Sequence, residues 1–315
     1  MADIKGYILK RLLLLVVVFI GVTALTFTLM SLTPGDPVLI MTGTRPINPE
    51  HLQALREMLG LDQPVYVQYF KYLWRVLHGN LGMDFRTGRP VIDEIMEALP
   101  RTLLLALCGL SVAVGIGISV GTISALKQYS ISDRISMFSS LALASIPNFV
   151  LALTLIYIFA YYFRLLPVAG SGSVKHIILP SLALGLGTSG LIARFTRTSI
   201  LEVVRQDYVR TARSKGLSER VVLVRHILKN ALISIITVIG LQFGYLMSGS
   251  FFIEIIFAYP GIGRLSVNAI MDKNFTVVQG VLLVVSSVYV LVNLVVDILY
   301  VYIDPRIRLA KAEER

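Results

Sequence analysis

Side chains that could carry out catalysis are scarce in this 315-residue chain. It has no phosphate-binding loop of the G-x-x-x-x-G-K-[ST] type and no H-E-x-x-H, C-x-x-C or G-x-S-x-G motif. The histidines are scattered, and the single cysteine lies in an apolar run: His51, His78, His176, His226 and Cys108. We therefore expect no catalytic residue, no metal site and no cofactor in this chain. Any work that it does must be driven from elsewhere.

A few polar side chains interrupt the apolar runs and are the best suited to contact a hydrophilic solute. They are Asn148, Gln242, Ser248 and Ser250. Polar groups are costly in hydrocarbon, so they face either a hydrated path or a neighbouring helix. These four residues are therefore the candidate substrate path, and hydrogen bonding between helices is the alternative. Pro147 is expected to bend its helix.

The segment at 201–230 is basic and helix-forming, although apolar runs flank it on both sides. Gly216 predicts a left-handed helix stop, and Ser218 followed by Glu219 predicts the start of a second helix. Apolar or small residues recur at helical spacing and predict one continuous helix face before the glycine: Leu201, Val204, Tyr208 and Ala212. The pattern of helix, glycine turn and helix is typical of a docking element outside the membrane.

Side chains of this segment are expected to meet a partner. Arg213 and Lys215 fall in the last turn of the first helix, where cations are favourable. Tyr208 and Val209 are expected to be exposed, and they would lack a partner unless another protein covered them. The alternative is that Tyr208 and Ala212 pack against helices of the same chain.

The composition places these elements in a membrane, since the chain is 55% hydrophobic and 15% charged. A run of about 20 apolar residues crosses the bilayer core. A shorter run at 177–193, with Pro180 and several glycines, is expected as a further crossing, and a re-entrant or surface segment is the alternative. Uncharged runs of full length lie at 12–32, 102–126, 135–163, 231–253 and 275–296. The sequence therefore predicts an all-α membrane protein with six transmembrane helices.

The charge distribution predicts the orientation of these helices. With six crossings, both termini and the loops at 127–134 and 194–230 share one side, which holds most of the 29 Lys and Arg residues. Loops rich in these residues stay in the cytoplasm, so both termini are expected there. Anionic lipid headgroups are a second expected partner for the basic loop. No nucleic-acid-binding pattern is present.

The region between the first two crossings has mixed composition and predicts a small external subdomain. Asn48 is expected to cap a short helix, and Pro64 to open an amphipathic one. The first apolar run is too long for a cleavable signal and is expected to remain as a transmembrane helix. The expected domains are 1–33 (N-terminus and first helix), 34–100 (external subdomain) and 101–315 (membrane core, with a cytoplasmic loop at 199–230).

Four motifs, in order along the chain, resemble those of ABC importer permeases of the oligopeptide, dipeptide and nickel family, of the first permease subunit type. The 207–217 segment is similar to the "EAA" coupling segment of that family, although Arg210 and Thr211 stand where the family has glutamate and alanine. The motifs are TPGDP at 33–37, DYVRTARSKGL at 207–217 followed by RHILKNAL at 225–232, YPGIGRL at 259–265, and NLVVD at 293–297 with DPR at 304–306.

The resemblance implies a binding-protein-dependent permease of the cytoplasmic membrane that has no ATPase activity of its own. It implies a second homologous permease subunit, two cytoplasmic ATPase subunits that bind ATP and Mg, and an external solute-binding protein. The implied substrates are di- or oligopeptides, with nickel, a metal chelate or an oligosaccharide as alternatives. The residues expected to couple to the ATPase are Asp207, Tyr208, Ala212, Arg213, Gly216 and Leu217.

An ion-coupled secondary transporter is the alternative from a different class. Such transporters use ionisable groups at mid-membrane, and most of the apolar runs here have none. Asn293 and Asp297 lie four residues apart on the last run, where Asp297 would have a structural partner or serve as a proton relay. A membrane-anchored enzyme would need a catalytic constellation, which the sequence lacks.

Overall fold

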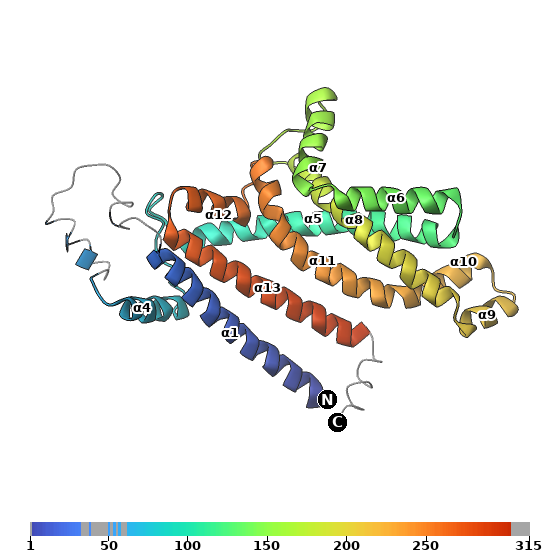
Figure 1. Cartoon of the computed structure of the whole chain (residues 1–315), viewed down its shortest axis with the longest axis horizontal. Helices are drawn as coiled ribbons and strands as arrows, with labels where there is room; N and C mark the ends of the chain where they lie inside the picture. Colours follow the sequence, from blue (N-terminus) through green and yellow to red (C-terminus); the bar gives the residue numbers. More distant parts are fainter. Residues whose placement is uncertain are drawn as a thin grey trace. The chain divides into compact units, whose positions relative to one another are not determined.

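The computed structural model describes residues 2–32, 38, 50, 53–54, 56–57 and 62–303, with the side chains of all of these except 2–12, 29–31, 248–249, 297 and 299–303. The predicted motifs at 33–37 and 304–306, the helix start at Asn48, and the side chains of Ser248 and Asp297 lie outside this description. Within it the chain is helical almost throughout (Figure 1), with one isolated bridge between Met83 and Pro90 and no β-strand. The prediction of an all-α membrane protein is confirmed.

Four of the described helical stretches are long and apolar enough to cross a membrane. The predicted crossing with Pro180 is a 30-residue helix, so its shortness in the sequence was misleading. The four are α5 (Val91–Leu126), α8 (Lys175–Val204), Glu219–Met247 and Phe275–Val296, the last lying within α13 (Phe275–Ile303). Helix α1 (Ala2–Leu32) has 31 residues, and its shorter apolar stretch is Leu13–Thr28. The count of six crossings stays a prediction.

The predicted third crossing at 135–163 is not one straight helix. It consists of α6 (Ile131–Ser145) and a second arm, α7 (Asn148–Leu155) with the π-helix η1 (Ile156–Tyr162), and the arms meet at 101°. Pro147 was expected to bend a helix, and it breaks this one. Because a proline forces the preceding residue out of the helical region, Ile146 is extended at φ −81° and ψ 125°. Figure 1 shows α7 turning steeply away from α6.

The second predicted crossing also differs, because α5 begins at Val91 and not at residue 102. Its first turn carries Asp93 and Glu94, which favour the positive end of the helix dipole. Because the predicted crossing was placed on an uncharged run, it did not include these first turns of α5. Pro100 lies inside the helix without ending it.

Contacts divide the chain into two units, one of Met1–Pro100 with Arg264–Leu291 and the other of Arg101–Gly263 with Val292–Arg315. In the first unit, α4 (Val65–Leu77) packs on α1.

Aromatic side chains join α4 to α1. The hydroxyl groups of Thr23 and Tyr69 lie 3.1 Å apart, and the Phe27 ring lies 5.5 Å from Tyr69 and 6.1 Å from Tyr72. Burial raises the pKa of the Tyr72 hydroxyl to about 12. Trp74, on the other side of the same helix, remains exposed. The amphipathic helix predicted after Pro64 is thus present, and two of its aromatic side chains pack on the first helix.

In the first unit, a loop after α4 is held to the turn between α12 (Ile262–Met271) and α13. Arg86 forms an ion pair with Asp272, and the Asn274 amide donates a hydrogen bond to Asp84. Asp84 and Asn274 are both buried. These polar contacts fix the loop without an apolar core of its own.

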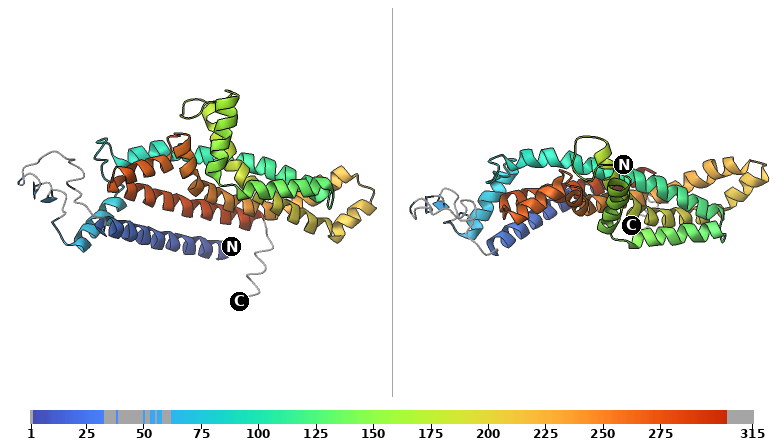
Figure 2. Two further views of the ribbon diagram at one scale, coloured as in Figure 1. Left: turned by 45° about the horizontal axis from the view of Figure 1, so that its top comes forward. Right: turned by 90° about the horizontal axis from the view of Figure 1, so that it is seen from above.

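In the second unit, α8 is the most buried of the long helices, and α6 runs alongside it in the views of Figures 1 and 2. Helix α5 approaches α8 closely because glycines face it. A Cβ on Gly117 would lie 2.7 Å from Ile192 Cβ, and one on Gly121 would lie 2.6 Å from Thr196 Cβ. Small residues allow such close helix contact. By contrast, nothing lies within 4 Å of a Cβ placed on Gly115.

Candidate functional site

The predicted docking element is a helical hairpin between α8 and α11 (Lys229–Ile256). Helix α8 ends at Val204, and α9 (Asp207–Ser214) begins after Gln206, which is extended at ψ 145°. The prediction of one continuous face from Leu201 to Ala212 is therefore wrong. The extended residue gives α9 its own axis, so the helical register is not carried across the break.

The turn after α9 has the geometry that the sequence predicted. Gly216 has φ 79°, and its N–H donates to the Arg213 carbonyl oxygen at 2.9 Å. Nothing lies within 4 Å of a Cβ placed on Gly216, so glycine is favoured here by the left-handed backbone and not by lack of space.

The second arm starts at the predicted residue but is built differently. Ser218 precedes α10 (Glu219–Val221), although its side chain makes no capping hydrogen bond. The π-helix η2 (Val222–Leu228) then joins α10 to α11 without a loop. The hairpin is therefore continuous with the long apolar helix that follows it.

Arg213 closes the hairpin across the glycine turn. Its Nε donates to Glu219 Oε1 at 2.8 Å, and its Nη2 donates to Oε2 at 3.2 Å. This fork fixes both the distance and the angle between α9 and α10. From the sequence, Arg213 was expected to complement the helix dipole and to couple to the ATPase, and its ion pair with Glu219 was not foreseen.

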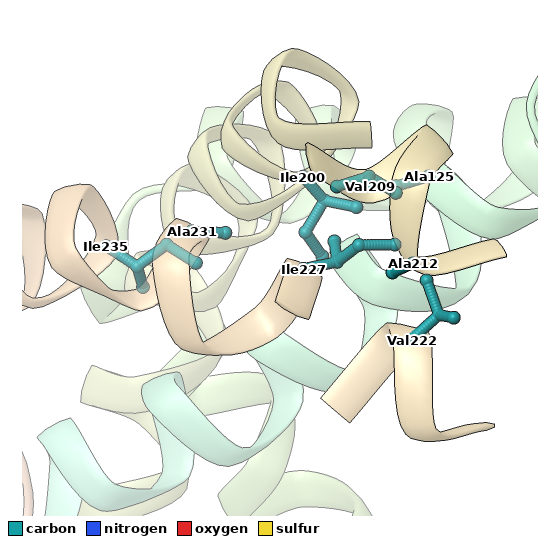
Figure 3. Packing of buried hydrophobic residues seen from close by; sticks show 8 residues of the cluster. All are labelled: Ala125, Ile200, Val209, Ala212, Val222, Ile227, Ala231 and Ile235. Carbon is teal, nitrogen blue, oxygen red and sulfur yellow. The ribbon is translucent and has the colours of Figure 1, made fainter. Parts of the chain in front are cut away.

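The buried face of α9 consists of Val209 and Ala212 (Figure 3). Val209 is fully buried, so the prediction that it is exposed is wrong; Ala212 packs against helices of its own chain. These two side chains belong to a cluster, here called the α9 seat, that also contains Ala125, Ile200, Val222, Ile227, Ala231 and Ile235. The α9 seat joins the hairpin to the ends of α5, α8 and α11.

The remaining surface of α9 and the turn after it are exposed. Tyr208 is 42% exposed and Leu217 is 40% exposed, and both lie among exposed charged residues. The Asp207 and Arg210 side chains form only a weak pair at 3.8 Å. The hairpin thus presents an aromatic ring and an aliphatic side chain within a charged surface, a composition that suits contact with another protein.

The candidate path residues come from α7 and α11, which pack against each other. Asn148 lies against α8, since its Oδ1 would be 2.5 Å from a Cβ on Gly187. Ser250 is fully buried and donates to the Met247 carbonyl oxygen of its own helix, whereas Gln242 is half-buried. Ser250 therefore behaves in this structure as an internally satisfied helix residue.

Two buried acidic side chains of the second unit were not identified from the sequence. Glu254 of α11 accepts a hydrogen bond from the Thr102 hydroxyl and one from the Gly263 N–H, both at 2.7 Å. A Cβ on Gly261 would lie 2.5 Å from both the Glu254 carboxylate and Thr102, which explains one glycine of the YPGIG motif. The sequence signal that could have identified Glu254 is a single acidic residue among apolar ones. A carboxylate is costly inside a membrane, so it is kept there for a reason.

The second such residue is Asp133, which forms an ion pair with Arg197 at 2.9 Å. The available signal was the S-x-x-D pattern at 130–133, which often caps a helix start. Sequence alone does not indicate its partner, because Arg197 lies 64 residues away.

Comparisons with known proteins agree with this architecture. Residues 117–309 match the family described as "Binding-protein-dependent transport system inner membrane component". Residues 4–106 match its N-terminal family, described as "Binding-prot-dependent transport system membrane comp, N-term".

Curated relatives match over nearly their whole length. The dipeptide transport system permease protein DppB of Escherichia coli K12 is 40% identical over 334 residues, which cover 96% of this chain and 98% of the relative. DppB of Alkalihalophilus pseudofirmus is 42% identical over 331 residues, with 96% and 99% covered. The glutathione transport system permease protein GsiC of Escherichia coli K12 is 40% identical over 303 residues, also with 96% and 99% covered.

Solved structures share the fold at low identity. An inward-facing structure of the MetNI methionine ABC transporter superposes with a TM-score of 0.59 at 16% identity, covering 67% of this chain and 96% of that one. An amino acid ABC transporter with histidines gives a TM-score of 0.54 at 16% identity, with 66% and 94% covered. This chain therefore belongs to the binding-protein-dependent transport system inner membrane component family and is a permease subunit of an ABC importer.

Proposed function

We propose that this chain and a second homologous permease subunit form a pathway that imports di- or oligopeptides across the cytoplasmic membrane. Permeases of this family work with ATPase and substrate-binding partners. In our proposal two cytoplasmic ATPase subunits bind ATP and Mg²⁺, an external solute-binding protein delivers the peptide, and this chain binds no cofactor. Both of its termini are cytoplasmic, as the distribution of Lys and Arg favours.

The observation that carries the proposal is the two-sided α9 hairpin. One side is buried in the α9 seat, and the other exposes Tyr208 and Leu217. A short helix held in this way can pass a displacement to the membrane helices as a rigid body. We therefore assign Asp207, Tyr208 and Leu217 to contact with the ATPase.

The other three predicted coupling residues set the geometry of the hairpin. Ala212 seats α9, Arg213 joins it to α10, and Gly216 permits the turn. Their replacement is expected to change the angle of the hairpin and not the chemistry of its exposed face.

Two observations bear on the substrate class. The relatives at about 40% identity are named for dipeptide and glutathione transport, and both of those solutes are short peptides. A peptide needs hydrogen-bonding partners along its path, and we assign this role to Asn148, Gln242 and Ser248. Ser250 is not assigned to it, because its hydroxyl is buried and bonds to its own helix. Nickel, a metal chelate or an oligosaccharide is the alternative cargo.

A stripe on α5 suits a second permease subunit. Ser111, Gly115 and Ser119 are exposed at four-residue spacing, and the space around Gly115 is empty. Small residues at this spacing let two helix backbones approach closely within a membrane. We assign this stripe to contact with the partner permease.

Reconstitution tests the proposal. The purified chain alone in liposomes should show no ATP-dependent uptake of a labelled dipeptide. Adding the partner permease, the ATPase subunits and the loaded binding protein should produce uptake that requires internal ATP. Uptake by the isolated chain driven by an ion gradient would instead establish a secondary transporter, and competition by nickel but not by peptides would establish the metal alternative.

A further inference from the structure

Asp133 is a buried carboxylate near the start of α6 that is held from three other parts of the chain. Arg197 of α8 donates from Nε to Oδ1 and from Nη2 to Oδ2, both at 2.9 Å. The Ser124 hydroxyl of α5 donates to Oδ1, and the Tyr129 N–H donates to Oδ2 at 2.9 Å. Each carboxylate oxygen therefore has two donors, and three helices meet at one side chain.

The backbone before α6 is shaped for this contact. Tyr129 has φ 64°, a left-handed conformation that costs a residue with a side chain about 1 kcal/mol or more. In that conformation its N–H points at Asp133. Ser130 then caps α6 by accepting the Asp133 N–H at 3.2 Å. The surrounding contacts hold the loop in one conformation despite the strain.

This network adjoins the α9 seat. Ser124 directly precedes Ala125, and Arg197 lies three residues before Ile200. Both Ala125 and Ile200 belong to the cluster that buries Val209 of α9. At about 1.5 Å per residue, Arg197 and Ile200 are separated by roughly 4.5 Å along the axis of α8.

Stability alone is a weak explanation for an ion pair at this place. The cost of desolvating two charges offsets most of their attraction, and an apolar pair of similar volume often stabilises a protein as well. A forked arginine–carboxylate contact differs from an apolar pair in fixing both distance and angle. Apolar surfaces can slide past each other, so only the forked contact defines one arrangement of the helices.

We propose that the Asp133–Arg197 pair positions the machinery that couples ATP hydrolysis to transport. It joins the ends of α5, α6 and α8 into one rigid block next to the α9 seat, so that a displacement of α9 moves all three helices together. This inference rests on the proposed function, since it concerns how movement of the hairpin reaches the membrane helices. In this proposal the pair acts through the α9 seat and not by contact with the ATPase or the peptide.

The test uses the complete transporter in nanodiscs and liposomes, with the loaded binding protein. Asp133→Asn removes the charge at nearly constant size. Basal ATP hydrolysis should stay within about two-fold of wild type, while stimulation by the binding protein and uptake per ATP should fall about five-fold or more. Arg197→Lys keeps the positive charge but loses the forked hydrogen bonds, so it should show the same defect. If Asp133→Asn does not assemble, Arg197→Lys tests the proposal in its place.

The matched control is Glu97→Gln, which removes an exposed ion pair with Arg89 at 2.6 Å. Stimulation should be unchanged in this variant, because exposed pairs contribute little and this one lies outside the α9 seat. Wild-type stimulation in both Asp133→Asn and Arg197→Lys would overturn the proposal.

A distance measurement tests the rigidity of this block directly and does not depend on transport activity. Spin labels at Lys127→Cys and Lys215→Cys, in a Cys108→Ser background, should give one narrow distance distribution with and without ATP. Asp133→Asn should broaden or shift it, and an unchanged distribution would contradict the rigid block. If the wild-type complex showed no ATP-driven uptake, the proposed function would fail, and this distance would still decide the inference.

Discussion

Neighbouring residues of α9 have opposite environments. Tyr208 is partly exposed at the open face of the hairpin, and Val209 is fully buried in the α9 seat. Because a helix turns by about 100° per residue, a single step separates a side chain that can meet a partner from one that holds the hairpin. Substitutions at the two positions should therefore fail in different ways.

Tyr208→Ala should leave the thermal unfolding midpoint of the purified chain unchanged and weaken ATPase binding by about ten-fold or more, because exposed aromatic side chains often dominate interfaces. Val209→Ala should instead destabilise the chain by about 2 kcal/mol through lost burial. Thermal unfolding in detergent and ATPase binding to nanodiscs separate the two effects. Equal loss of stability in both variants would contradict the assignment of Tyr208 to the exposed face.

Gly216→Val should insert into the membrane and assemble, but lose most of the ATPase stimulation by the loaded binding protein. The left-handed conformation costs a branched residue about 1–2 kcal/mol, so the turn should adopt a different geometry. Gly216→Asn is the control, because asparagine tolerates positive φ and nothing near Gly216 obstructs a side chain. Normal stimulation in Gly216→Val would rule out a geometric role for this turn.

At the scale of helices, the glycines of α5 divide into two groups. Gly117 and Gly121 face α8 of the same chain, whereas the space around Gly115 is empty. The sequence contains these small residues but does not indicate which way each one faces. Bulky replacements on the two sides should separate packing within the chain from packing between subunits.

Gly121→Leu should destabilise the isolated chain by about 1–3 kcal/mol, because the new side chain would overlap Thr196 of α8. Gly115→Leu should leave the isolated chain as stable as wild type and reduce the amount of partner permease recovered with it. Unfolding midpoints and co-purification yields are the measurements. Full recovery of the partner with Gly115→Leu would remove this stripe of α5 from the subunit interface.

At the scale of the whole chain, the break between α6 and α7 makes orientation the central question. A pair of arms meeting at 101° is either a bent crossing or a re-entrant segment. If it were re-entrant, the segment before α8 would lie on the same side as the loop before α6. The direction of α8, and with it the side that carries the α9 hairpin, would then reverse.

Single cysteines in a Cys108→Ser background decide between these topologies. Lys127→Cys and Lys215→Cys should react with a membrane-impermeant reagent only from the cytoplasmic face, and Ser171→Cys only from the external face. This expectation follows from the excess of Lys and Arg in the loops at 127–134 and 194–230. Labelling of Ser171→Cys from the same face as Lys127→Cys would show a re-entrant segment and place the hairpin outside.

The sequence by itself determined the features that depend on neighbouring residues or on composition. Apolar runs indicated the membrane class, and the glycine after Lys215 indicated a left-handed turn, which the structure confirms. Pro147 indicated a bend, although not its size. These features can be predicted from a sequence because their causes are local. A proline or a glycine determines the conformation of its own backbone, and an apolar run determines whether the segment favours water or lipid.

Only the tertiary structure decided which faces are buried and which distant residues meet. Thr102 and Glu254 are 152 residues apart, and Asp133 and Arg197 are 64 apart. A helix that is apolar all round has no polarity pattern to mark its packed side. In a membrane, that side is selected by shape, glycine contacts and polar pairs between helices, and these exist only once the helices have come together.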